Sequence, residues 1–310
     1  MIRLQFLRYV CSVFILFIVV GISTSDATDS KNVESQILKG SIDDRQYQYF
    51  VLNNKLKVLL ISDETADKAS ASMDVNVGSY HDPIDREGLA HFLEHMLFLG
   101  TKKFPEADAY QAFISDNGGS HNAYTSSHHT NYYFDVDDKK LDDALDRFSQ
   151  FFVAPLFDET YVDRERNAVH SEYQASLRDD FRRSYDVYRN VINQAHPEAK
   201  FSVGSLVTLA DRANDNVRDD LLSFYKQHYS ASKMSLVVLG RQPLDELKTM
   251  VVDRFSQVPL SIDNTQADTN KKALQPLFMP GQLPMEVLSK PVKELRQMSM
   301  NFPLPSISQY

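Results

Sequence analysis

Hydrophobic and polar positions along the chain follow two alternating patterns, one typical of strands and one typical of helices. Apolar residues alternate on both sides of a turn at 53–54, which predicts a hairpin over 47–61. Strands with a buried face are also predicted by the alternation over 69–78 and by the short apolar runs at 132–134 and 234–239. Because strands and helices mix without a strict βαβ repeat, the pattern indicates an α+β fold.

Helical spacing is clearest over 87–99, where apolar residues recur every three or four positions until Gly100. Glycine often follows the last turn of a helix because it tolerates a left-handed backbone. The apolar side chains over 141–152 have the same spacing and predict a helix packed on the core. Further elements are expected as helices over 159–180 and 244–255 and as a strand over 287–302.

The first 25 residues have the three parts of a secretory signal peptide. Arg3 and Arg8 precede an apolar run over 9–22, and small residues follow it. A membrane-spanning helix is the alternative, but the run is shorter than the roughly 20 residues that such a helix needs. Cys11, the only cysteine, lies in this segment, so the mature chain has no disulfide. We expect a periplasmic or secreted protein without a stable membrane segment after cleavage.

The composition is that of a globular protein, with 43% hydrophobic and 24% charged residues among 310. The formal net charge of -9 and the lack of a Lys/Arg-rich stripe argue against nucleic acid as a partner. A soluble, acidic protein is expected.

The candidate chemistry lies in the helix expected over 87–99. His91, Glu94 and His95 fall on one face of such a helix, so that two imidazoles and a carboxylate converge. This H-x-x-E-H spacing is the inverted form of a zinc-peptidase motif, and imidazole and carboxylate groups suit Zn²⁺. The alternative is a pair of histidines that are only hydrogen-bonded within a core, because short motifs also occur by chance.

A catalytic zinc usually has three protein ligands, so a third must come from elsewhere. Glu165 and Glu172 lie two turns apart on one face of the helix expected over 159–180. Either could reach the metal, and most Glu residues in such helices simply face solvent. Helical spacing does not choose between the two.

Beyond the five-residue motif, several blocks of residues stand out along the chain: 91–105, 122–125, 129–136, 144–148 and 167–172. Taken in order, they resemble the pitrilysin and insulin-degrading enzyme family of zinc metallopeptidases, with bacterial protease III among the nearest likenesses. The resemblance extends over about 47–305 and is far more specific than the motif alone.

The resemblance implies a mixed, largely antiparallel sheet packed against helices, and one zinc per chain. It implies His91, His95 and Glu172 as the metal ligands. It also implies Glu94 as the general base and Glu165 as an acid that supports the metal site. The expected activity is hydrolysis of peptide bonds by a zinc-activated water molecule.

The substrates implied by the resemblance are extended peptides. Asn122 and Ala123 match the edge strand on which the peptide backbone lies, and Phe98 and Tyr124 match apolar pocket positions. Arg182 departs from the pattern of insulin-degrading enzyme, where a Trp lines that pocket. The side-chain preference is therefore not carried over.

The resemblance also implies a domain order, in which the polar segment 26–45 leads into a catalytic domain over 46–260. A Pro-containing linker over 261–284 and the start of a second, truncated homologous domain over 285–310 would follow. The alternative to an active peptidase is a truncated or non-catalytic member that binds zinc and peptide but needs a missing C-terminal half. That half, or a second copy of the chain, would then be its partner.

We expect the mature protein to begin near Asp26, because the N-terminal segment has the features that the secretion machinery reads. Intact-mass spectrometry of the protein purified from its natural source measures this directly. A mass that retains Met1 and the apolar run would contradict cleavage.

Overall fold

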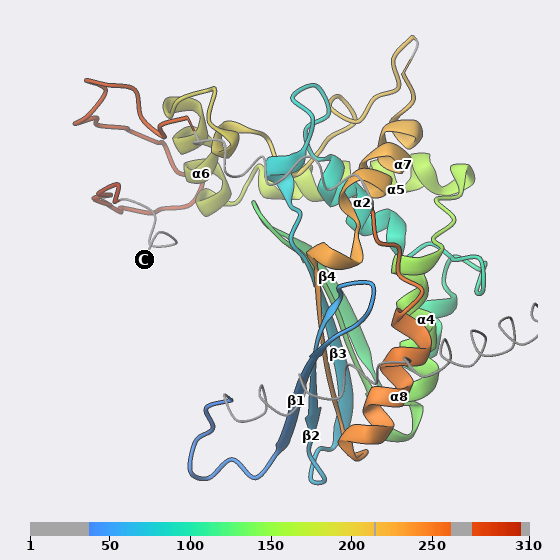
Figure 1. Ribbon diagram of the computed structural model, residues 1–310. Coiled ribbons are helices and arrows are strands. Elements are labelled where there is room, and N and C mark those ends of the chain that lie inside the picture. Colours follow the sequence, from blue (N-terminus) through green and yellow to red (C-terminus); the bar gives the residue numbers. More distant parts are fainter. Residues whose placement is uncertain (1–36, 214, 262–274, 305–310) are drawn as a thin grey trace, which may run out of the picture.

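The computed structural model describes residues 37–213, 215–261 and 275–304, so the expected signal peptide, Cys11 and most of the expected linker lie outside the described residues. A six-stranded sheet organises the fold, in the order β1-β2-β6-β3-β5-β4 (Figure 1). Only the pair β2–β6 is parallel, so the predicted α+β fold with a mixed, largely antiparallel sheet is confirmed. The strands are β1 Gln46–Val51, β2 Lys57–Ser62, β3 Lys68–Val75, β4 Ser120–Thr125, β5 Thr130–Asp137 and β6 Met234–Gly240.

Helices α4 (Leu141–Val153) and α8 (Leu244–Phe255) cover one face of the sheet (Figure 1). Alternate residues of β3 and β5 are buried on that face, because successive side chains of a strand point to opposite sides. The core is rich in aromatic rings, which pack mainly edge to face or tilted, as their quadrupoles favour. Its aromatic centre consists of Tyr110, Tyr132, Phe134, Phe148, Phe151, Phe152 and Phe255.

Helices α2, α5 and α7 come together near one end of the sheet, and α6 extends outward (Figure 1). Helix α3 packs against α4, β4 and β5. Within the described residues, no helix is long and apolar enough to cross a membrane. The helices are α2 Leu89–Leu97, α3 Ala109–Asp116, α5 Glu159–Ser176, α6 Asp180–Val191 and α7 Val217–His228, and four 3₁₀ turns are η1 Ser79–His81, η2 Asp138–Lys140, η3 Pro197–Ala199 and η4 Ala231–Lys233.

Two expectations about these elements were wrong. The strand predicted over 287–302 does not form, although its apolar pattern is real; Leu288 is 88% exposed and Phe302 is 79% exposed. A strand needs a neighbouring strand to pair its backbone groups, and this segment has none in the described residues.

The helix predicted over 159–180 ends at Ser176, and the Asp179 carboxylate then caps α6 by accepting a hydrogen bond from the backbone N–H of Arg182.

The start of α2 is fixed by a buried aspartate and a close approach of two glycines. Asp82 accepts hydrogen bonds from the backbone N–H groups of Gly88 and Ala90, each at 2.8 Å. Gly88 has φ +90°, and a Cβ there would lie 2.2 Å from Cα of Gly204. Only glycine fits because it tolerates this φ and has no side chain.

Gly88→Ala should therefore lower the free energy of unfolding by about 3 kcal/mol or more, since the new methyl group combines backbone strain with a clash against backbone atoms. Gly118→Ala is the matched control, because Gly118 also has a positive φ (+69°) but nothing within 4 Å of an added Cβ. It should cost only about 1 kcal/mol. Urea unfolding measures both values, and equal losses would contradict the role given to the Gly88 contact.

Candidate metal centre

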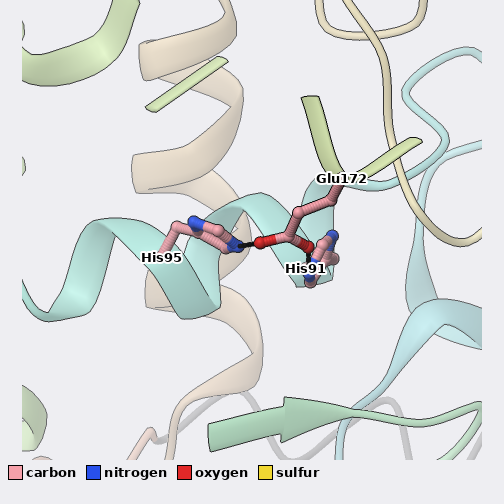
Figure 2. Close-up of side chains that lie close together, drawn as sticks. All are labelled: His91, His95 and Glu172. Carbon is pink, nitrogen blue, oxygen red and sulfur yellow. Dashed lines mark ion pairs between the residues drawn. The ribbon is translucent and has the colours of Figure 1, made fainter. Parts of the chain in front are cut away.

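Two histidines on α2 and one glutamate on α5 form a cluster of metal-binding groups. One nitrogen of His91, one of His95 and one carboxylate oxygen of Glu172 all lie within 4.8 Å of one another. Figure 2 shows the Glu172 carboxylate between the two imidazoles. Its Oε2 lies 3.4 Å from Nε2 of His91, and its Oε1 lies 3.4 Å from Nε2 of His95. Of the two acids between which helical spacing does not choose, Glu172 is therefore the one that lies close to both imidazoles.

The two nitrogen–oxygen separations fit a zinc ion. Zinc binds imidazole nitrogen and carboxylate oxygen at about 2.0 to 2.2 Å, so two ligand atoms of a tetrahedral site are about 3.3 to 3.6 Å apart. The two 3.4 Å nitrogen–oxygen distances fall in that range. The donor set of two imidazoles and one carboxylate is also one that zinc peptidases use, and it leaves a fourth position open.

The other nitrogen of each imidazole is held by the protein. Nδ1 of His91 donates to the backbone carbonyl oxygen of Val203 at 2.6 Å. Nδ1 of His95 lies 3.4 Å from Oε2 of Glu165, and Oε1 of the same carboxylate accepts a hydrogen bond from Nε of Arg164. Such partners fix the ring orientation and leave Nε2 free for a metal. Glu165 therefore lies behind the cluster, in contact with the nitrogen of His95 that faces away from Glu172.

The charges around the cluster perturb its titratable groups. Hydrogen bonds from His91 and His95 hold the pKa of Glu172 well below its usual range. Burial alone would lower the pKa of His95, but Glu165 and Glu172 outweigh it and raise this pKa to about 9. The carboxylates on either side of His95 thus favour its charged form, and a metal ion bound in place of that proton would meet the same negative groups.

Glu94 lies beside the cluster and is 7% exposed. Burial raises the pKa of its carboxyl group, opposed by the nearby His91 and by a hydrogen bond from the Thr125 hydroxyl to Oε2 of Glu94. The carboxylate of the inverted motif is therefore held in one orientation, and it faces the same cavity as the histidines.

A cavity of about 670 Å³ opens over the cluster. Strand β4 forms one wall and is an edge of the sheet, because β5 is its only neighbour in the described residues. Every site residue expected from the sequence lines this cavity, so these residues share one location. Their individual roles stay predictions. They are His91, Glu94, His95, Phe98, Asn122, Ala123, Tyr124, Glu165 and Glu172.

Some contributors were missed by the sequence analysis. Thr125 ends the Asn-Ala-Tyr-Thr block, and its place beside a motif residue could have marked it as a candidate. The Val203 carbonyl group belongs to the backbone, so no residue type indicates it; the glycine that follows, Gly204, is the only local signal. Arg164 resembled any other charged residue on a helix.

Two family models match the chain. Residues 57–195 match "Insulinase (Peptidase family M16)", and residues 216–310 match "Peptidase M16 inactive domain". The chain belongs to peptidase family M16. Members of this family are zinc-dependent. The single sheet crosses the division between the two matched segments, since β6, from the second segment, lies between β2 and β3, from the first.

Similar proteins agree with this membership. The A-factor-processing enzyme of Saccharomyces cerevisiae is 42% identical over 90% of this chain and 27% of its own length. Insulin-degrading enzyme of Mus musculus is 47% identical over 76% of this chain and 24% of its own length. The crystal structure of pitrilysin has a TM-score of 0.71 and 42% identity, covering 72% of this chain and 24% of pitrilysin. The chain thus spans about a quarter of the length of these relatives.

The folded chain should bind close to one zinc ion, and Glu172→Gln or His95→Ala should weaken binding far more than Glu165→Gln. Loss of a ligand removes a bond to the metal, whereas loss of an orienting acid typically costs about 10- to 100-fold in affinity. Elemental analysis after gel filtration and chelator competition provide the measurements. Equal zinc affinity in the wild type, Glu172→Gln and His95→Ala proteins would rule out this ligand set.

Proposed function

We propose that this chain carries the catalytic site of a zinc-dependent endopeptidase that hydrolyses extended peptides. The observation that carries the proposal is the joint placement of a three-ligand cluster, a buried carboxylate and a free strand edge around one cavity. Membership of peptidase family M16 supports the reaction class.

His91, His95 and Glu172 would hold the zinc ion. Bound zinc polarises a carbonyl group and makes a coordinated water molecule more acidic. Glu94 is the general base in this proposal, because its carboxylate lies beside the histidines and Thr125 fixes its orientation. It would accept a proton from the attacking water and return it to the departing amine.

The free edge of β4 would bind the backbone of the peptide. Its outer N–H and C=O groups have no partner strand in the described residues, so an extended peptide can pair with them as an added strand. Asn122, Ala123 and Tyr124 lie on this strand and line the cavity, with Phe98 on the helix side. Backbone pairing depends little on sequence, which favours flexible peptides over folded proteins as substrates.

A second candidate is that the chain binds zinc and peptide but needs additional protein for turnover. The chain spans only about a quarter of the length of its relatives, and its described C-terminal segment exposes many apolar side chains. A further portion of a longer protein, or another copy of the chain, would then complete the site. Export through the N-terminal segment remains part of the proposal and is tested separately by the mass of the mature protein.

Zinc-loaded protein should cleave an internally quenched fluorescent peptide, and Glu94→Gln should slow turnover by about 10²- to 10⁴-fold, because it removes the base. Glu106→Gln is the control, since Glu106 is an exposed acid outside the cavity. Removal of zinc with a chelator should abolish turnover, and added zinc should restore it.

The same assay separates the two candidates. The second candidate would be favoured if the chain binds zinc but its Glu94-dependent turnover is much slower than that of insulin-degrading enzyme of Mus musculus in the same assay. Turnover that is insensitive to Glu94→Gln and to zinc removal would contradict both.

A further inference from the structure

The cavity has two chemically different ends. Glu165 of α5 faces His95, whereas Glu172, two turns later, also reaches His91, so α5 runs opposite to α2. Phe98 follows His95 on α2 and marks an aromatic end, where its ring packs near His121. Val203, whose carbonyl oxygen is hydrogen-bonded to His91, and Ser176, one turn after Glu172 on α5, mark the other end. Ser202, next to Val203, and Arg182, six residues after Ser176, line the same cavity.

Arg182 is the distinctive group at this second end. It is exposed in the first turn of α6, and its backbone N–H is anchored to the Asp179 carboxylate at 2.8 Å. Among the described residues its guanidinium group has no hydrogen bond or ion pair. Arg164, the other arginine lining the cavity, is already paired with Glu165 at 2.9 Å. Arg182 is therefore the cation of the cavity wall that is free to bind a ligand.

The acids of the cavity have other partners. Glu94 accepts a hydrogen bond from Thr125, Glu165 contacts His95 and Arg164, and Glu172 lies between the two imidazoles. The two acids next to Arg182 in sequence also have partners: Asp179 accepts a hydrogen bond from the backbone N–H of Arg182 itself, and Asp180 accepts hydrogen bonds from the backbone N–H groups of Val292 and Lys293. A carboxylate brought in by a ligand would complement the guanidinium group.

We propose that Arg182 forms a subsite for an Asp or Glu side chain of the peptide, on the His91 side of the scissile bond. This inference rests on the proposed function, because it requires a peptide that lies along β4 and extends past His91. The opposite side of the scissile bond would face the aromatic end around Phe98. A preference for acidic residues on one side only is the expected consequence.

Binding rather than turnover is the appropriate measurement, because it does not depend on catalytic competence. The zinc-loaded Glu94→Gln chain is titrated with fluorescein-labelled, C-terminally amidated peptides that carry Glu, Gln or Lys at one of six successive positions. Fluorescence anisotropy gives the affinity of each. At one position the Glu peptide should bind about fivefold more tightly than the Gln peptide, since the ion pair is partly exposed. Added salt should reduce this difference.

The same titrations with additional substitutions assign the preference to one residue. Arg182→Gln should remove the Glu preference, and Arg182→Glu should turn it into a preference for Lys at the same position. Arg178→Gln should leave it unchanged, because Arg178 is also exposed and four residues away but does not line the cavity. Unchanged zinc content and thermal unfolding establish that each variant is folded.

The outcomes are distinct. A Glu preference that survives in Arg182→Gln, or equal affinities at every position, overturns the subsite while leaving peptide hydrolysis intact. A preference that appears only in peptides with a free C-terminal carboxylate also overturns it, because the ligand would then be the chain terminus. Loss of all peptide binding would contradict the subsite and the proposed function together.

Discussion

The buried carboxylate of Asp82 fixes where the motif helix begins, and the rest of the site depends on that position. It accepts hydrogen bonds from two backbone N–H groups at the start of α2, while Gly88 packs directly against Gly204. Burial raises the pKa of Asp82 to about 7 although those donors favour its ionised form. The Gly204 contact also brings in the segment whose Val203 carbonyl orients His91, so one junction sets both the helix and its first imidazole.

The site combines groups from elements that are far apart in sequence. Helix α2 supplies two imidazoles and a carboxylate, α5 supplies a carboxylate on either side of His95, and β4 supplies a free strand edge. Glu94 is nearly buried, and burial raises its pKa, which suits the proposed role of general base. Rigid packing around α2 holds these charged groups together against their mutual repulsion and the cost of burial.

The local pattern of apolar residues predicted the elements well where each buries one apolar face against the core. The hairpin over 47–61 and the helices over 87–99, 141–152 and 244–255 were predicted within a few residues of their observed bounds. The pattern failed over 287–302, where alternating apolar residues have no neighbouring strand in the part of the chain that the structure describes. It also missed the break before α6, because Asp179 acts as a helix cap only after the chain turns.

The sequence by itself determined the motif, its helix and the face that carries His91, Glu94 and His95, because these follow from a spacing of 3.6 residues per turn. It also carried the family resemblance. Only the tertiary structure decided that Glu172 meets both imidazoles while Glu165 stays behind His95, since that depends on how α5 crosses α2. The contacts of Thr125 and Val203 likewise required the fold, because contacts between distant segments leave no periodic trace in a single sequence. The same holds for the guanidinium group of Arg182, which has no partner among the described residues.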